Sequence, residues 1–286
     1  MKSNMNTKIF LDSGDPNVTR ELLDRKIKLD GQTTNPSLVA SNPKAKLLKK
    51  GQKLTSRDLI NFYKEIVQEI DEILPGKPIS VEVYADLKTK ANEMVEQGVN
   101  MSHWARNVHI KVPANLEGLK AARELVSMGI KVNITLVFSL EQAYGVALVT
   151  KHAKRGDVFI SPFVGRLDDK GLDGVDLVLK IKKLYQINQI SNVLILASSI
   201  RNLQVFNFFL NQKMDLITAP KDIIADYFLK NQNFEPEKNF LQSRIALKKF
   251  DLDHLKVSNS LENLNLENQF LIDGITKFTN DWNNLL

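Results

Sequence analysis

The sequence contains no cysteine, which excludes disulfides, thiol nucleophiles and cysteine-ligated metals. Its four histidines show no paired spacing of the HxxxH kind, so we expect no metal site, with magnesium bound by carboxylates as the alternative. It has no run of about 18 apolar residues that could span a bilayer. Residues 1–10 are polar and lack the apolar core of a signal peptide. We therefore expect a cytoplasmic protein without membrane partners.

The composition is that of an ordinary soluble globular protein, with 43% hydrophobic and 25% charged residues. The 286 residues suit one large α/β barrel or two small domains. The net charge is +6, but the lysine clusters do not alternate with aromatic residues. We therefore expect no nucleic-acid partner, and only a modest attraction for anionic metabolites.

Lys111 is a cation within the segment 108–113, which otherwise reads as a short buried strand. Side chains alternate between faces along a strand, so Lys111 points away from its aliphatic neighbours. In a parallel sheet covered by helices, that direction is the packed interior. Burying an ammonium is costly, and loss of its proton would make the amine a nucleophile. On this segment alone, a lysine that reaches solvent from a strand end is an equal alternative.

Short apolar segments alternate with helical patterns over the first 230 residues. The predicted strands are 8–12, 31–34, 79–84, 108–112, 132–136, 158–161, 193–197 and 215–218. The clearest helix has a capping candidate at Thr55, helical apolar spacing from Leu59 to Ile73, and a stop at Pro75. The alternation predicts the α/β class and a (β/α)8 TIM barrel. A doubly wound open sheet is the alternative, but the glycine-rich phosphate loops common in that fold are absent.

The tail of the chain carries a different pattern. Residues 231–265 are polar and weakly patterned, with a break at Pro236. Apolar residues then recur at helical spacing, namely Phe270, Ile272, Ile275, Phe278 and Trp282. We expect residues 1–286 to form a single barrel domain, with 231–286 as a C-terminal helical extension that packs on the barrel.

Five predicted strands carry polar residues on the face opposite to their aliphatic ones. These residues are Asp12, Glu82, Lys111, Asn133 with Thr135, and Ser161. Each one alone could be a hydrogen-bonded structural group, the commoner fate of a buried polar residue. Together they lie at or near strand carboxyl ends, where barrel enzymes build their active sites.

This set of side chains suits Schiff-base chemistry. A lysine amine attacks a ketone, and carboxylates move the protons needed to dehydrate the carbinolamine and break a carbon–carbon bond. Desolvation in the barrel favours the neutral amine, whereas Asp12 and Glu82 favour the ammonium. The sequence leaves the balance between these effects open.

These residues lie in motifs that resemble those of transaldolases, class I Schiff-base enzymes of the pentose phosphate pathway. The motifs are FLDSGDP (10–16), DGQTTNPSL (30–38), ISVEV (79–83), IKVPANLEGLKA (110–121), VNITLVFSLEQA (132–143), ISPFVGR (160–166) and ASSIRN (197–202). They occur in the family's order and cover the barrel to about residue 220. TTNPS together with ISPFVGR is specific to the family.

The resemblance implies a role for each matched residue. Lys111 would form the Schiff base, Asp12 would be the acid/base at the C4 hydroxyl, and Glu82 with Thr135 would assist carbinolamine dehydration through a shared water. The implied contacts to the dihydroxyacetone unit are Asn35, Asn133 and Ser161, with Thr33 in the same second-strand motif. Phe163 is a further implied substrate-binding residue, and the implied contacts to phosphate are Arg166, Ser199 and Arg201.

The resemblance also implies a reaction. A dihydroxyacetone unit would pass from sedoheptulose 7-phosphate to glyceraldehyde 3-phosphate, giving erythrose 4-phosphate and fructose 6-phosphate. The partners would be these sugar phosphates, with no organic cofactor or metal. The likeness to longer transaldolases, which includes DGITKF at 273–278, favours a homodimer.

Two alternatives remain at this stage. A fructose 6-phosphate aldolase shares the fold and lysine but releases free dihydroxyacetone, and that subgroup usually carries tyrosine where Phe163 stands. A non-catalytic sugar-phosphate-binding barrel would not need Lys111, Asp12 and Glu82 together. The chain departs from the family's usual motifs at Asn115 and Ile200, while all the implied chemical residues are retained.

Overall fold

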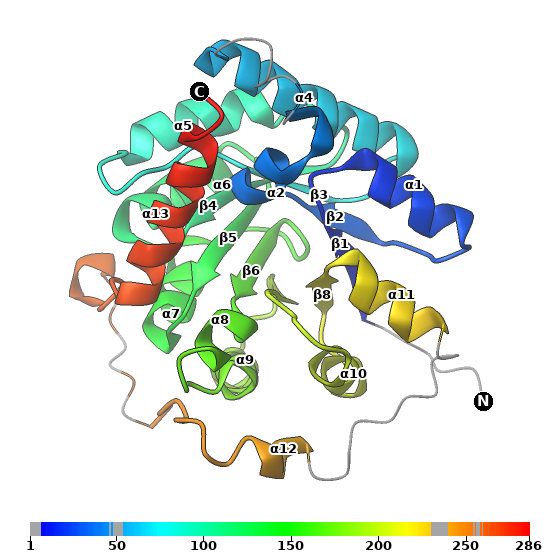
Figure 1. Cartoon of the computed structure of the whole chain (residues 1–286). Helices are drawn as coiled ribbons and strands as arrows, with labels where there is room; N and C mark the ends of the chain where they lie inside the picture. The colour runs from blue at the N-terminus through cyan, green and yellow to red at the C-terminus, as the bar shows by residue number, and fades with distance from the viewer. Residues whose placement is uncertain are drawn as a thin grey trace.

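The computed structural model describes residues 7–45, 47, 54–229, 240–253, 255, 258 and 260–286. Eight strands, each parallel to its neighbours, form a closed barrel in chain order (Figure 1). They are β1 (Lys8–Asp12), β2 (Gly31–Thr33), β3 (Ile79–Glu82), β4 (Val108–Pro113), β5 (Val132–Val137), β6 (Val158–Pro162), β7 (Val193–Ala197) and β8 (Leu216–Ala219). The predicted TIM barrel is confirmed, and so is its additional C-terminal helix.

The helices pack around the outside of the barrel (Figure 1). They are α1 (Pro16–Asp24), α2 (Pro36–Ser41), α4 (Ser56–Ile73), α5 (Ala91–Met101), α6 (Leu116–Ser127), α7 (Leu140–Val149), α8 (Val164–Asp168), α9 (Gly174–Ile187), α10 (Leu203–Asn211) and α11 (Lys221–Leu229). Helix α4 begins as its sequence predicts, because Thr55 and Asp58 form a reciprocal capping box. It ends before Gly76, whose φ of 70° favours a residue without a side chain.

The barrel interior is apolar toward the amino ends of the strands. Phe10, Phe159, Leu194, Leu196 and Leu216 form this inner cluster. His109 stacks on Phe159 with ring centroids 4.0 Å apart, and its Nε2 donates to the carbonyl oxygen of Gly156 over 3.0 Å. Burial lowers the pKa of His109 to about 3, so the ring is neutral at pH 7 and acts as a packing group. Most of the candidate site's polar side chains lie nearer the carboxyl ends of the strands.

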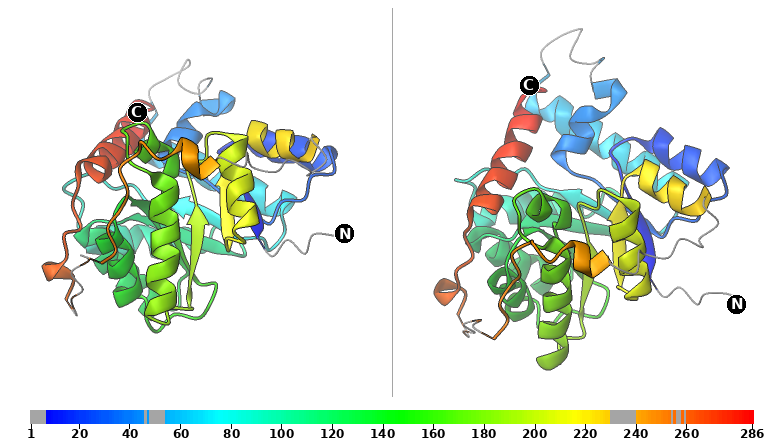
Figure 2. Two further views of the ribbon diagram at one scale, coloured as in Figure 1. Left: turned by 90° about the horizontal axis from the view of Figure 1, so that it is seen from below. Right: turned by 60° about the horizontal axis from the view of Figure 1, so that its bottom comes forward.

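Residues 240–250 pack on the outside of the barrel. Helix α12 (Phe240–Ser243) lies between α9 and α10 (Figure 2), and the Phe240 ring centroid is 4.8 Å from that of Phe208. Arg244 is buried and donates from Nε to Asp173 Oδ1 over 2.8 Å and from Nη2 to Asp168 Oδ1 over 2.5 Å. Lys249 also pairs with Asp173. These ion pairs hold residues 244–249 against the start of α9.

Replacing Asp173 by Asn should destabilise the fold by about 3 kcal/mol, because Arg244 would keep its buried charge without its main partner. Burial alone would raise the pKa of Asp173, but hydrogen bonds from Arg244 and Lys249 lower it below its ordinary value. A lowered pKa means that the stabilisation is complete above about pH 4 and fades as the pH falls further. Urea unfolding of both proteins at several pH values measures this. Asp222→Asn, an exposed residue in the first turn of α11, is the control. An Asp173 variant as stable as wild type at pH 7 would refute the role of the ion pairs.

Helix α13 (Gln269–Asn283) lies across the barrel beside α2 and against β5 (Figures 1 and 2). Its buried face consists of Leu271, Gly274, Ile275, Phe278 and Trp282. Phe270 and Ile272, expected on this face, are only half-buried, and Leu271 takes the inner position. A short 3-10 turn, η1 (Leu261–Asn263), precedes α13.

The other predictions about the tail have different outcomes. The predicted break at Pro236 lies outside the described residues, and the single-domain assignment stays a prediction. No helix in the described part of the chain has the length and apolarity to cross a membrane.

Candidate active site

A cavity of about 240 Å³ opens at the carboxyl ends of the strands. Ten of the twelve residues that the sequence nominated line it, namely Asp12, Thr33, Asn35, Lys111, Thr135, Ser161, Phe163, Arg166, Ser199 and Arg201. The other two, Glu82 and Asn133, lie next to it in the barrel wall. Side chains from six different strands, or from the loops that follow them, thus meet in one cavity.

Lys111 is held on the inner face of β4 by strand register. It pairs with Glu82 on β3 and with Asn133 on β5. The Lys111 side chain is 4% exposed, and its Nζ lies 2.9 Å from Glu82 Oε2. The same nitrogen donates to the backbone carbonyl oxygen of Thr34 over 2.9 Å. The amine is therefore inside the barrel, which removes the solvent-exposed alternative.

Tyr63 on α4 supports this arrangement from outside the strands. Its hydroxyl accepts from the backbone N–H of Glu82 over 2.9 Å and hydrogen-bonds to the Thr34 hydroxyl. Thr34 in turn donates to the carbonyl oxygen of Ser80 over 2.7 Å. The loop that receives the Lys111 amine is thus fixed by an outer helix.

The two carboxyl groups near Lys111 share one electrostatic property. Burial raises the pKa of Asp12, although the charge of Lys111 and the Thr33 hydroxyl, which donates to Asp12 Oδ1 over 2.6 Å, oppose the rise. Burial likewise raises the pKa of Glu82 against the opposing field of Lys111. A carboxyl group whose pKa is raised holds its proton more readily than an ordinary one, which suits it to exchange protons with a substrate.

Thr135 differs from its neighbours in hydrogen bonding. Its hydroxyl is buried at the cavity wall and has no partner among the residues that the structure describes. Ser161, in contrast, donates to Asn133 Oδ1 over 2.7 Å, and Asn133 donates to the Ser80 hydroxyl over 3.0 Å. The polar atoms of Asn133 therefore support Ser161 from below instead of lining the cavity.

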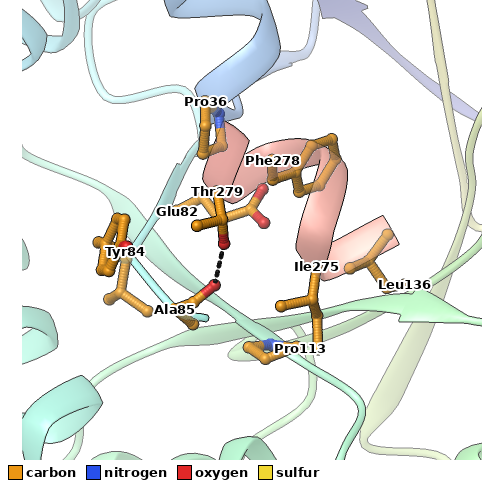
Figure 3. A pocket seen from close by; sticks show the side chains of 10 residues that line it. Pro36, Glu82, Tyr84, Ala85, Pro113, Leu136, Ile275, Phe278 and Thr279 are labelled. Atoms are coloured by element: carbon orange, nitrogen blue, oxygen red, sulfur yellow. Dashed lines mark hydrogen bonds between the residues drawn. The ribbon is translucent and has the colours of Figure 1, made fainter. Parts of the chain in front are cut away.

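A second, much smaller cavity of about 10 Å³ adjoins Glu82. Figure 3 shows Glu82 within it and residues Ile275, Phe278 and Thr279 of α13 closing over it. Thr279 donates to the Ala85 carbonyl oxygen over 3.1 Å. This volume approaches what one water molecule needs. The C-terminal helix therefore walls the space behind the Lys111–Glu82 pair.

The far end of the main cavity is cationic. Arg166 is sandwiched between aromatic rings, with its guanidinium carbon 5.1 Å from the Phe163 centroid and 5.2 Å from that of Phe278. Burial lowers the pKa of Arg166, but a guanidinium keeps its charge at neutral pH. Arg201 is half exposed and paired with Asp169.

A close backbone approach shapes this cationic end. Gly165 donates its N–H to the Ser199 carbonyl oxygen over 3.0 Å. A Cβ at position 165 would lie 2.5 Å from that oxygen and 2.7 Å from Arg201 Nε, so only glycine fits. Ser199 itself has a φ of 57°, a left-handed conformation that is uncommon for serine. The loop thereby holds Ser199 and Arg201 beside Arg166.

The two departures from the family motifs have structural explanations. Asn115 is the N-cap of α6, where its side chain accepts from the backbone N–H of Gly118. Ile200 is 2% exposed and packs in the hydrophobic core. Neither residue lines the cavity.

The sequence analysis missed several cavity residues, including Ser37, Thr218, Lys277 and Phe278. Thr218 lies on β8 with inward parity, and its hydroxyl is 2.7 Å from that of Thr33, so strand alternation could have identified it. Lys277 and Phe278 were not identifiable in this way, because helical periodicity does not say which surface a helix covers. Among the described residues, no group of three or more carboxylates and histidines is arranged to hold a metal ion.

Known proteins are similar to this sequence over most of its length. The family model "Transaldolase/Fructose-6-phosphate aldolase" matches residues 9–286. A protein of Paracoccus denitrificans named "Probable transaldolase" is 38% identical over 231 residues, covering 80% of this chain and 93% of its own. A protein of the same name from Herpetosiphon aurantiacus is 42% identical over 195 residues, covering 68% and 75%. The resemblance found in the motifs is confirmed, and the chain belongs to the transaldolase/fructose-6-phosphate aldolase family.

Proposed function

We propose that the protein is a transaldolase that moves a dihydroxyacetone unit from sedoheptulose 7-phosphate to glyceraldehyde 3-phosphate through a Schiff base on Lys111. The products would be erythrose 4-phosphate and fructose 6-phosphate. The observation that carries this proposal is the buried Lys111 amine, 2.9 Å from a Glu82 carboxyl group and facing a cavity with a cationic far end. Family membership supports the same reaction class.

The first step would be attack of Lys111 Nζ on the C2 carbonyl carbon of the ketose, giving a carbinolamine. Loss of water then gives the imine, and a proton must reach the departing oxygen. Glu82, whose pKa burial raises, is suited to supply that proton. Thr135, with its unpartnered hydroxyl, would orient a water between the two residues.

Asp12 would act in the second step. Its carboxylate takes the proton of the C4 hydroxyl, the C3–C4 bond breaks, and the bonding electron pair moves into the protonated imine to give an enamine. The aldose leaves with a new C=O group. In the reverse sense, the enamine attacks the acceptor aldehyde, Asp12 returns its proton to the new hydroxyl, and hydrolysis frees Lys111.

The remaining residues would bind and orient the sugar. The Oδ1 of Asn35 caps α2 by accepting from Leu38, and no described residue accepts from its amide N–H groups, which would bind hydroxyls of the dihydroxyacetone unit. Ser161, supported by Asn133, and Thr33 would contact the same unit. Arg166, Ser199 and Arg201 would bind the phosphate, since guanidinium groups match phosphate oxygens in geometry and charge.

The aldolase alternative differs in the fate of the enamine, which would be protonated and released as free dihydroxyacetone. Phe163 favours transfer, because its ring carries no hydroxyl that could deliver a proton to the enamine. The ring packs against Phe138, with the two centroids 5.7 Å apart. Fructose 6-phosphate and erythrose 4-phosphate incubated with the enzyme should yield sedoheptulose 7-phosphate. Accumulation of free dihydroxyacetone without the heptulose would favour the aldolase. A protein that binds these sugars but turns over neither would be the non-catalytic barrel.

Several expectations about the protein's setting belong to this proposal. We propose that it works without a metal or organic cofactor, that its partners are sugar phosphates with neither nucleic acid nor membrane, and that it is a cytoplasmic homodimer.

Replacing Arg201 by Ala should raise KM for fructose 6-phosphate by about 10- to 100-fold, since a hydrogen bond to a charged group contributes about 1.5–3 kcal/mol. The KM for unphosphorylated fructose should stay nearly constant. Steady-state kinetics on both sugars measure the difference. Arg155→Ala, which removes an arginine paired with Asp215 away from the cavity, is the control. An equal loss for both sugars would argue against a phosphate site at Arg201.

A further inference from the structure

The C-terminal helix brings a third cation to the active-site cavity. Lys277 on α13 lines the same space as Arg166 and Arg201. Its neighbour Phe278 packs on the Arg166 guanidinium, which fixes this turn of the helix against the cationic end. Lys277 is 58% exposed, so it lies at the rim, within reach of a ligand and of solvent. Figure 1 shows α13 on the left side of the barrel, running from near α7 to the C-terminus.

Arg201 and Lys277, the two cations at the rim of the cavity, are each paired with a carboxylate. Arg201 is paired with Asp169, and Lys277 Nζ lies 2.8 Å from Asp281 Oδ2 on the next turn of α13. Asp281 also accepts from the Ser37 hydroxyl, so it would keep a partner if Lys277 moved away. Arg166, deeper in the cavity, has no ion pair with any residue in the described part of the chain.

The rim ion pairs are weak enough to exchange. Pairs that are half exposed contribute about 0–1 kcal/mol. A sugar phosphate carries about two negative charges and three acceptor oxygens, so it can replace a carboxylate as the partner of a lysine. A ligand phosphate held by Arg166 and Arg201 would lie in the cavity that Lys277 also lines.

We propose that Lys277 is a phosphate-binding residue contributed by the C-terminal helix, and that it exchanges Asp281 for the substrate's phosphate group. The assignment rests on the proposed function only for the identity of the substrate as a sugar phosphate. It gives the C-terminal extension a direct part in selecting phosphorylated substrates, in addition to closing the space beside Glu82.

The test compares Lys277→Met with Lys277→Arg, using Lys120→Met as the matched control. Lys120 forms a similar ion pair within α6, with Glu117, and does not line the cavity. Lys277→Met should raise the dissociation constant of inorganic phosphate and KM for fructose 6-phosphate by about five- to tenfold, at the lower end of what a charged hydrogen bond contributes. The kcat and the KM for unphosphorylated fructose should change little. Lys277→Arg should restore most of the affinity, whereas Lys120→Met should resemble wild type.

Asp281→Asn tests the exchange of partners. Removing the competing carboxylate should lower the dissociation constant of inorganic phosphate by about two- to fivefold, the size of a surface ion pair. An unchanged or raised constant would overturn the exchange. Unchanged phosphate affinity in Lys277→Met, or equal losses for fructose and fructose 6-phosphate, would overturn the assignment of Lys277.

Failure of the proposed function would look different. A wild-type protein without transfer activity refutes the transaldolase proposal, whereas the calorimetric binding of inorganic phosphate still tests Lys277. If the wild-type enzyme is active and Lys277→Met binds phosphate as tightly as wild type, only the proposed role of Lys277 is refuted.

Discussion

Replacing Lys111 by Met should abolish transfer, lowering kcat by a factor on the order of 10⁵, as removal of a covalent nucleophile does in other enzymes. Methionine has a similar length but cannot form an imine. Activity assays with fructose 6-phosphate and erythrose 4-phosphate, together with a thermal melt, measure the effect.

The fold should tolerate this substitution. Replacing one member of a buried ion pair usually leaves a costly charge, but burial already raises the pKa of Glu82, so its carboxyl group can become neutral. We therefore expect a melting temperature close to or above that of wild type. Lys131→Met is the control, because Lys131 is a half-buried lysine bonded to Asn107, before the start of β5 and remote from the cavity. Transfer activity in Lys111→Met above about one per cent of wild type would mean that the nucleophile is elsewhere.

Replacing Asp12 by Asn should lower kcat by about 10²- to 10⁴-fold, the usual contribution of a general base. Asparagine can keep the hydrogen bond from Thr33 but cannot take the C4 proton. Imine formation should persist, since it depends on Lys111 and Glu82. Borohydride should therefore trap the whole hexulose phosphate on the variant, where the wild type is trapped with the three-carbon unit. Phosphate affinity should be nearly unchanged.

The pH dependence gives a second check on Asp12. Because burial raises the pKa of Asp12, its base form is lost as the pH falls through a value above the ordinary aspartate range. The acid limb of the wild-type rate profile should lie correspondingly high, and it should disappear in Asp12→Asn. Asp24→Asn, at an exposed position on α1, serves as the control. An unaltered rate in Asp12→Asn, or loss of trapping, would contradict the assignment.

The alternation of side chains was enough to predict much of this site. Glu82 and Lys111 could be placed on the inner face because their neighbours along the strand are aliphatic and pack against helices. Alternation does not give register, however. The 2.9 Å approach of Lys111 to Glu82 follows from the pairing of β3 with β4, which no local pattern encodes.

The sequence was less informative about the positions of side chains and helices that depend on long-range packing. Asn133 has the right parity for a substrate contact, but its side chain bonds to Ser80 and Ser161 in the barrel wall, so its contact to a substrate stays a prediction. The periodicity of the last helix predicts that it packs on the barrel, but not that two of its residues line the cavity. The sequence therefore could not identify Lys277 as a cavity residue. Its position at the cavity follows from the packing of α13 against α2 and β5.

Borohydride reduction in the presence of fructose 6-phosphate, followed by peptide mass analysis, tests the central claim most directly. The account predicts a dihydroxyacetone-derived adduct on the peptide that contains Lys111, and none in Lys111→Met. An adduct on another lysine, or no adduct in an enzyme that still transfers the unit, would contradict it.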